Sequence, residues 1–469
     1  MTASNTDLAF LSAAELARRL QTGETTSAAL TERFLARIAR HDEKLHAYIA
    51  LYADEARMAA EAADLAIKSG HRVGPFHGVP MALKDIIDLE GRVTTGGSKA
   101  WESRVSPTTA TLAAKLIAAG MVILGKTHTV EFAMGGWGTN EHMGTPWNPW
   151  DLATHRTPGG SSAGSGVSVA AGLAPWAIGT DTGGSVRLPS AWCGLAGLKT
   201  TIGRISVHGV LPLAHTLDSP GPMCRTVEDA AILYTLLAGP DPLDPLTQRR
   251  AVEDPLPGLK RGIAGLRLAR LPAAEREPVE AEVLAAYDEA LKVLAHLGAE
   301  IVEVPLPRRF ADFAALTGKI IGAEGYLHVG HMVDDMDLPI DPAVRPRIWQ
   351  GKNMSARDYL LALREQQAVK AEFMAALAGV DALLTPTVPT AAIPVAQVDQ
   401  TKTPAHFTRA FNLLEMCAAA VPNGFTSGGL PTSLQIACRG YDEALALRIA
   451  WAFEQATGYT GRVPPGLEA

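Results

Sequence analysis

Cysteine is scarce in this sequence of 469 residues, and long apolar runs are absent. The four cysteines are far apart and form no CxxC pair, which argues against a disulfide framework or a cysteine metal site and favours buried thiols in a reducing compartment. The longest apolar run, near residues 167–178, is interrupted by Gly172 and Pro175 and is too short to cross a bilayer. The first ten residues show no basic-then-apolar pattern, so no signal peptide is predicted. We therefore expect a cytoplasmic protein without a membrane partner.

An excess of basic charge is also missing. Lysine and arginine number 42 against 49 acidic residues, which gives a net charge of −7 and no basic face for a nucleic acid backbone. His328 and His331 have the spacing of ligands on one helical face, but no third ligand is suitably placed. We therefore expect no nucleic acid partner, no metal and no cofactor.

Apolar residues and glycine are abundant, at 47% hydrophobic residues and 44 glycines, which is typical of a protein with a large core. Alternation at residues 79–83, a helical pattern over 109–119 and a short apolar run at 121–124 predict a strand, a helix and a strand. This order predicts an α/β fold: one domain with a large mixed, mostly parallel β-sheet covered by helices on both faces.

Three regions of the chain differ in character. Residues 1–70 read as helices that wrap around the main body, because Ser12 and Glu15 form a capping-box pattern and apolar residues repeat every four positions after it. Residues 74–240 hold the glycine-rich motifs, and residues 306–375 are mainly helical and more polar. We interpret the last region as a substrate cap, although its apolar residues would equally suit a core.

Two glycine turns that each present a serine lie within residues 158–187, joined by a predicted helix and strand. A nucleophilic serine needs a base and backbone donors for its oxyanion. The glycines before Ser185 allow successive N–H groups to converge on one point. Lys84 ends a short apolar strand and is a candidate base if burial keeps it neutral. The stretch therefore predicts an active site.

Three motifs in order carry a family resemblance: GVPMALKD at 78–85, TPGGSSAGSG at 157–166 and GTDTGGSVRLPSAWCGLAGLKT at 179–200. Together with the 24-residue spacing of Ser161 and Ser185, they resemble the amidase signature family over about residues 8–460. The resemblance implies one amidase-signature domain and a Ser–Ser–Lys triad. Ser185 would be the acylated nucleophile, Ser161 a bridging serine after a cis peptide bond, and Lys84 the base.

The resemblance also implies roles around the triad. The backbone N–H groups of Thr182, Gly183 and Gly184, with that of Ser185, would form the oxyanion hole. Met134, Gly135 and Gly136 would face the acyl part of the substrate, while Ser162, Asp181 and Arg187 would support the two loops. A separate hypothesis places Trp137, Trp147 and Trp150 along an apolar or aryl pocket, with ordinary packing as the alternative.

The leading functional hypothesis is a stand-alone amidase that cleaves C–N bonds of small or aryl amides, and also carbamates (urethanes) and esters, through an acyl-enzyme on Ser185. Its partners would be small-molecule amides, carbamates or esters, and a homodimer is compatible with the sequence. One alternative is the glutaminase subunit of a tRNA-dependent amidotransferase. That subunit carries a YDGVRYG-like stretch, and residues 306–375 show no counterpart, since 322–331 read GAEGYLHVGH. A non-catalytic binding protein would be expected to lose part of the triad, which is complete here.

Overall fold

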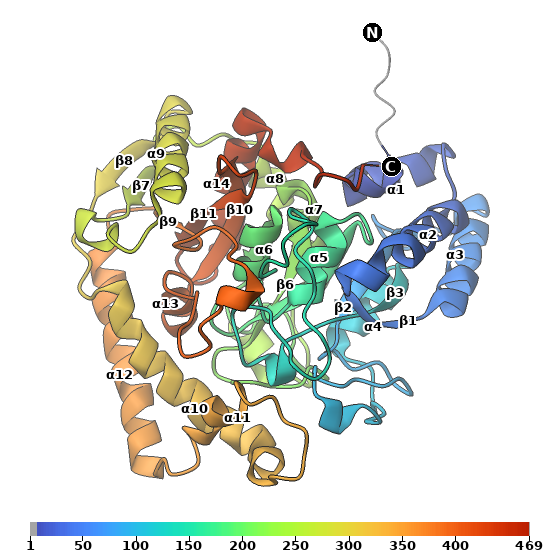
Figure 1. Ribbon diagram of the computed structural model, residues 1–469. Helices are drawn as coiled ribbons and strands as arrows, with labels where there is room; N and C mark the ends of the chain where they lie inside the picture. The colour runs from blue at the N-terminus through green and yellow to red at the C-terminus, as the bar shows by residue number, and fades with distance from the viewer. Residues whose placement is uncertain (1–6, 469) are drawn as a thin grey trace.

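Apolar segments without a polar face form the centre of the β-sheet. β2 (Pro80–Lys84) and β4 (Trp176–Asp181) are buried at every position and pair in parallel, as Ala82 opposite Ala177 shows. Strands buried on both faces need helices above and below them. The computed structural model, which describes residues 7–468, has this layered arrangement, with helices on both faces of the sheet (Figure 1). The α/β fold in one domain is confirmed, while the opening residues 1–6 lie outside the described residues.

One sheet contains all eleven strands found in residues 7–468, in the order β1-β3-β2-β4-β6-β5-β10-β11-β9-β7-β8. Besides β2 and β4, the strands are β1 (Tyr48–Leu51), β3 (Val122–Thr127), β5 (Ala196–Lys199), β6 (Ser219–Cys224), β7 (Arg267–Arg270), β8 (Glu300–Glu303), β9 (Ala382–Pro386), β10 (Cys417–Phe425) and β11 (Pro431–Cys438).

The sheet is mixed, as predicted, but antiparallel pairs outnumber parallel ones. Within the described chain, six neighbouring pairs are antiparallel and four are parallel. The expectation of a mostly parallel sheet was therefore wrong in this respect. It was drawn from strand–helix–strand spacing, whereas β10 and β11 are joined by a short turn that forces antiparallel pairing.

The helices found in residues 7–468 are α1 (Ala13–Thr22), α2 (Ser27–Leu45), α3 (Ala53–Lys68), α4 (Thr111–Ala118), α5 (Ala163–Ala170), α6 (Arg187–Cys193), α7 (Val227–Leu237), α8 (Leu256–Leu259), α9 (Ala281–His296), α10 (Phe313–Asp334), α11 (Arg345–Trp349), α12 (Ala356–Ala376), α13 (Arg409–Leu413) and α14 (Glu443–Thr457). None of those described is long and apolar enough to cross a membrane. The four cysteines are buried and unpaired: Cys193, Cys224, Cys417 and Cys438.

The N-terminal segment packs its apolar stripe against the sheet and donates a strand to it. α1 begins at the predicted cap, where the Glu15 N–H donates to Ser12 Oγ at 3.1 Å. In α2 the residues that repeat every four positions are buried. β1 falls between α2 and α3 and pairs antiparallel with β3, so the segment is not entirely helical. Leu467 also lies beside this segment, because its carbonyl accepts a hydrogen bond from Arg37 Nη2 at 2.8 Å.

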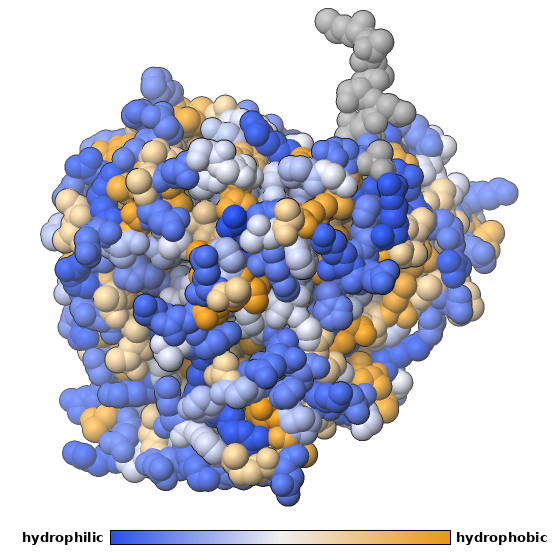
Figure 2. Space-filling model, in the orientation of Figure 1, coloured by the Kyte–Doolittle hydropathy of each residue, from blue (hydrophilic) through white to orange (hydrophobic). Residues whose placement is uncertain are grey.

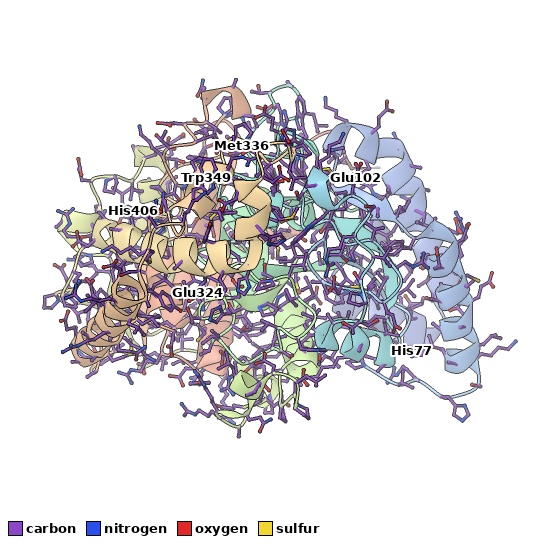
Figure 3. All side chains as sticks on the ribbon, turned by 90° about the horizontal axis from the view of Figure 1, so that it is seen from below. His77, Glu102, Glu324, Met336, Trp349 and His406 are labelled. Carbon is purple, nitrogen blue, oxygen red and sulfur yellow. The ribbon has the colours of Figure 1, made fainter. Side chains whose placement is uncertain are left out.

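Residues 313–376 form a long helical hairpin, α10 with α12, at one end of the molecule (Figure 1). Glu324 of α10, labelled in Figure 3, accepts a hydrogen bond from the Thr216 N–H (2.9 Å), which ties the hairpin to the body, and one from the Tyr359 hydroxyl of α12 (2.7 Å), which joins the two helices. Phe310 and Phe313 pack into the core near Phe407 and Phe373. On the face shown in Figure 2, apolar residues are scattered among hydrophilic ones.

Candidate active site

Lys84 reaches the site from the end of β2 and is fully buried. Its Nζ donates to Ser161 Oγ at 2.7 Å and to Thr180 Oγ1 at 2.8 Å. Burial lowers the pKa of Lys84 to about 7, although the negative charges of Asp218 and Asp181 oppose this shift. A large fraction of the amine is therefore neutral near pH 7, as a base requires.

Ser161 and Ser162 occupy the turn that leads into α5. The Gly160–Ser161 peptide bond is cis, and the Ser161 carbonyl accepts a hydrogen bond from the Val130 N–H at 3.1 Å. The Ser162 N–H donates to the Ser185 carbonyl at 3.3 Å, and Ser162 Oγ donates to the Thr180 carbonyl at 3.3 Å. Ser162 thus connects the first serine turn to the second.

Small residues in α5 let this helix approach its neighbours closely. A Cβ on Gly164 would lie 2.2 Å from the Ala47 carbonyl oxygen and 2.4 Å from the His128 nitrogen. Real Cβ atoms do not approach backbone atoms so closely. The glycine therefore lets the start of α5 lie against the residue before β1 and the residue after β3.

Ser185 follows β4 and a turn of two glycines, and 8% of its surface is exposed. Gly184 has a φ of 136°, a conformation open to glycine, and a Cβ there would lie 2.3 Å from Thr408 Oγ1. The Gly184 N–H donates to Asp181 Oδ1 at 2.8 Å. This bond corrects the expected oxyanion hole, because it occupies one of the predicted donors and leaves the N–H groups of Thr182, Gly183 and Ser185 as the candidates.

A buried ion pair holds the second turn. Arg187 donates to both carboxylate oxygens of Asp181, at 2.9 and 3.0 Å, and both side chains are fully buried. Burial alone would raise the pKa of Asp181, but the charge and hydrogen bonds of Arg187 hold it well below its usual range. Asp181 Oδ2 also accepts the Val186 N–H at 3.1 Å, and Asn412 Nδ2 donates to Oδ1 at 2.9 Å. The carboxylate therefore fixes the backbone on both sides of Ser185.

Asp218 is a site residue that sequence reasoning missed. It accepts a short hydrogen bond from the Thr182 hydroxyl and further bonds from the Leu213 and Ala214 N–H groups, at 2.9 and 3.0 Å. Burial raises the pKa of Asp218 to about 6, even though these bonds favour the charged form. No local motif marks this position, since its proximity to Lys84 arises only from the fold.

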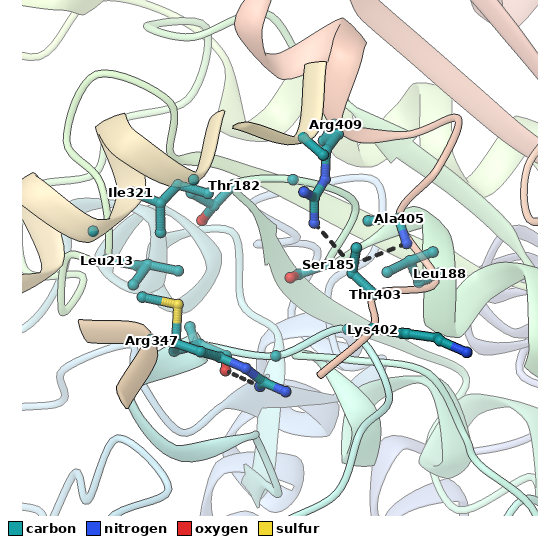
Figure 4. A pocket seen from close by; sticks show the side chains of 18 of the residues that line it. Thr182, Ser185, Leu188, Leu213, Ile321, Arg347, Lys402, Thr403, Ala405 and Arg409 are labelled. Carbon is teal, nitrogen blue, oxygen red and sulfur yellow. Dashed lines mark hydrogen bonds between the residues drawn. The ribbon is translucent and has the colours of Figure 1, made fainter. Parts of the chain in front are cut away.

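A cleft of about 260 Å³ opens beside Ser185 (Figure 4). Met134, Gly135 and Gly136 form part of its wall, and Thr182 and Gly183 form another part. α10 contributes Ala314, Gly318, Ile321 and Gly322, a different set from its core residues. Arg347, Gln400, Thr403 and Arg409 also line the cleft and were missed, because no sequence motif connects them to the serine turns.

The three tryptophans of the 134–150 region pack against neighbours instead of lining this cleft. Their ring partners are Trp192 for Trp137 (5.6 Å between centroids), His155 for Trp147 (4.3 Å) and Phe425 for Trp150 (5.0 Å). These tryptophans therefore have a packing role and do not form the apolar or aryl pocket of the earlier hypothesis.

Comparisons with known proteins agree with this architecture. The amidase family profile matches residues 29–447. A protein of Geobacter metallireducens, named as the A subunit of glutamyl-tRNA(Gln) amidotransferase, is 38% identical over 95% of this chain and 97% of the relative. The structure of the corresponding A subunit from Thermotoga maritima has a TM-score of 0.83 and 32% identity, over 99% of each chain. A structure reported for a vestigial protein complex and the origins of an s-triazine catabolic enzyme has a TM-score of 0.89 and 31% identity, over 96% of this chain and 99% of that one.

These relatives correct two expectations. The stand-alone amidase on small or aryl amides was favoured over an amidotransferase component because one YDGVRYG-like stretch is missing, yet the similarity to proteins named as the amidotransferase's A subunit spans nearly the whole chain. The expectation of small-molecule partners alone, without nucleic acid, was likewise wrong, since the relatives' name refers to a tRNA and to one component of a larger enzyme. It rested on net charge, which describes no particular surface. With the profile match over residues 29–447, the chain belongs to the amidase family, which supports hydrolysis of carbon–nitrogen bonds.

Proposed function

We propose that this chain is the glutamine-hydrolysing subunit of an amidotransferase, which releases ammonia from the side-chain amide of glutamine so that a partner protein can amidate a tRNA-bound glutamate. The observation that carries the proposal is the 38% identity, over 95% of the chain, to a protein named as the A subunit of glutamyl-tRNA(Gln) amidotransferase. In this proposal residues 74–240 carry the chemistry, residues 1–70 wrap around them, and residues 306–375 cap the cleft.

The first half-reaction forms an acyl-enzyme. Ser185 Oγ attacks the carboxamide carbon while its proton passes through Ser161 to the neutral amine of Lys84. The N–H groups of Thr182, Gly183 and Ser185 stabilise the oxyanion, and losing one such donor typically costs about 10²- to 10³-fold in rate. The relay then protonates the nitrogen, the C–N bond breaks and ammonia leaves. The 2.7 Å contact between Lys84 and Ser161 supports this route.

The second half-reaction returns the enzyme to its starting state. Water attacks the γ-glutamyl ester on Ser185 and gives up a proton through Ser161 to Lys84. The ester C–O bond breaks, Ser185 regains its proton, and glutamate is released. Buried side chains keep the relay aligned in both steps, in particular Thr180, whose hydroxyl oxygen accepts a hydrogen bond from Lys84 Nζ at 2.8 Å.

The proposal is tested with the full chain assembled with its partner subunits and supplied with glutamine and glutamyl-tRNA. We expect Ser185→Ala and Lys84→Ala to abolish both glutamate release and glutaminyl-tRNA formation from glutamine. Added ammonia should restore glutaminyl-tRNA formation, because it bypasses the hydrolytic site. Ser168→Ala is a matched control, since this buried serine of α5 donates only to the Ser165 carbonyl, at 3.0 Å, among the described residues. An assembly that makes glutaminyl-tRNA from glutamine equally fast with Ser185→Ala would refute the proposal.

A further inference from the structure

Two arginines face the cleft beside Ser185 with only neutral hydrogen-bond partners. Arg347 of α11 donates to the Met134 carbonyl at 3.0 Å and to the backbone and side-chain oxygens of Gln400 at 2.6 and 2.9 Å. Arg409, the first residue of α13, donates to Thr403 Oγ1 at 2.8 Å. Figure 4 shows the two guanidinium groups entering from different sides, with Ser185 between them in this view. Among the described residues that line the cleft there is no aspartate or glutamate.

Arg409 is the less satisfied of the two. Its Nε is buried and, within residues 7–468, has no hydrogen-bond partner. Burial, and then the nearby charge of Arg347, lower the pKa of Arg409 to about 10. In the free protein the Arg409 guanidinium is therefore a partly desolvated cation whose charge and hydrogen-bonding capacity are poorly compensated, which is unfavourable in free energy. An anion bound in the cleft would offset that cost and accept the unused N–H.

The third cationic side chain of the cleft, Lys402, has a well-compensated positive charge. Lys402 has a side chain that is 77% exposed, and its Nζ lies 3.6 Å from Asp399 Oδ2. Water and a neighbouring carboxylate therefore compensate it. Burial lowers the pKa of Arg347, but the nearby negative charge of Asp341 opposes this shift. The least compensated positive charge of the cleft is therefore that of Arg409. Both arginines lie next to the loops expected to hold the reacting amide, since Arg347 Nη1 borders Gly135 and Arg409 borders Gly183.

We propose that Arg409, supported by Arg347, binds a carboxylate of the substrate, and that the cleft recognises this carboxylate without recognising an ammonium group. The substrate class is then a carboxamide that carries a free carboxylate at the far end of a short chain. Glutamine meets this requirement, but its α-ammonium group finds no acidic partner among the described residues of the cleft lining. This inference rests on one part of the proposed function, namely that the site hydrolyses a carboxamide through an attack by Ser185.

The test compares kcat/KM for three probes: glutamine, glutaramate (glutamine without its amino group) and butyramide, which has neither charge. We expect the wild-type chain to hydrolyse glutaramate at least as well as glutamine. Arg409→Gln should lower kcat/KM for both carboxylates by about 10- to 100-fold, mainly through KM, since a charge-assisted hydrogen bond contributes about that much. Its effect on butyramide should be much smaller. Arg409→Lys, which keeps the charge but not the planar fork, should fall in between. Arg357→Gln removes an exposed arginine of α12 outside the cleft and serves as the control.

The outcomes separate this inference from the proposed function. If Arg409→Gln lowers all three probes equally, or if glutaramate is a far poorer substrate than glutamine, carboxylate recognition by Arg409 is refuted while glutamine hydrolysis stands. If glutaramate is hydrolysed in an Arg409-dependent manner but glutamine is not, even with partner subunits present, the inference stands and the proposed function fails. Melting temperatures identify a variant that does not fold. If Arg409→Gln does not fold, the kcat/KM values of Arg409→Lys for the three probes are compared with those of the wild type instead.

Discussion

The buried pair of Asp181 and Arg187 gives a sharp test of how the fold holds the nucleophile. Arg187→Met removes the guanidinium and leaves a buried carboxylate without its counter-charge. Arg187 makes hydrogen bonds to Asp181, to the Thr408 carbonyl (2.9 Å) and to the side chains of Gln435 and Asn412 (both 2.6 Å). Removing one partner of such a pair typically costs about 3–5 kcal/mol.

That free energy converts into a melting temperature. An unfolding entropy of about 2.1 cal/mol/K per residue over 469 residues is about 1 kcal/mol/K, so Arg187→Met should melt about 3–5 °C lower than the wild type. Because Asp181 also fixes the Gly184 and Val186 N–H groups, kcat should fall by about 10- to 100-fold through misplacement of Ser185.

The assay combines thermal unfolding with glutamine hydrolysis. Arg18→Met is the matched control, because Arg18 forms an exposed pair with Glu15 and should change the melting temperature by less than about 1 °C. The double variant Asp181→Asn/Arg187→Met should recover part of the stability, since no unpaired charge remains buried, without recovering kcat. An Arg187→Met protein with unchanged melting temperature and unchanged kcat would refute the reasoning.

Three further predictions concern the pH response and the packing. Since Lys84 must be neutral to accept a proton and its pKa is about 7, kcat/KM should rise with pH through about 7 and fall roughly tenfold per unit well below it; a flat profile between pH 5 and 8 would contradict this. Asp218→Asn removes a negative charge that favours protonated Lys84, so the acid limb of the profile should move to lower pH, and a move to higher pH would contradict it. Gly164→Ala should lower the free energy of unfolding by about 1–3 kcal/mol through overpacking against Ala47, whereas Gly258→Ala, with nothing within 4 Å of its Cβ, should not; denaturant unfolding of both decides.

Local patterns predicted the parts of the fold that depend on neighbours in sequence. β2, α4, β3, α5 and β4 all lie within a few residues of their predicted positions, because apolar periodicity and glycine stops are properties of short segments. The strands that were missed lack such patterns. β6 reads SPGPMC, and its Pro220 and Pro222 are unusual inside a sheet. They are accommodated because β5 pairs only with Met223 and Cys224 of this strand.

The motifs that contain Lys84, Ser161 and Ser185, and their order, can be read from the sequence, since each motif is a contiguous run of residues. The residues that surround these motifs in space depend on the tertiary structure. Complete burial in the fold lowers the pKa of Lys84 to about 7, and the fold brings Asp218 near the lysine and Arg409 into the cleft. Burial and long-range proximity follow from which strands pair and which helices pack over them, and no local run of residues contains that information.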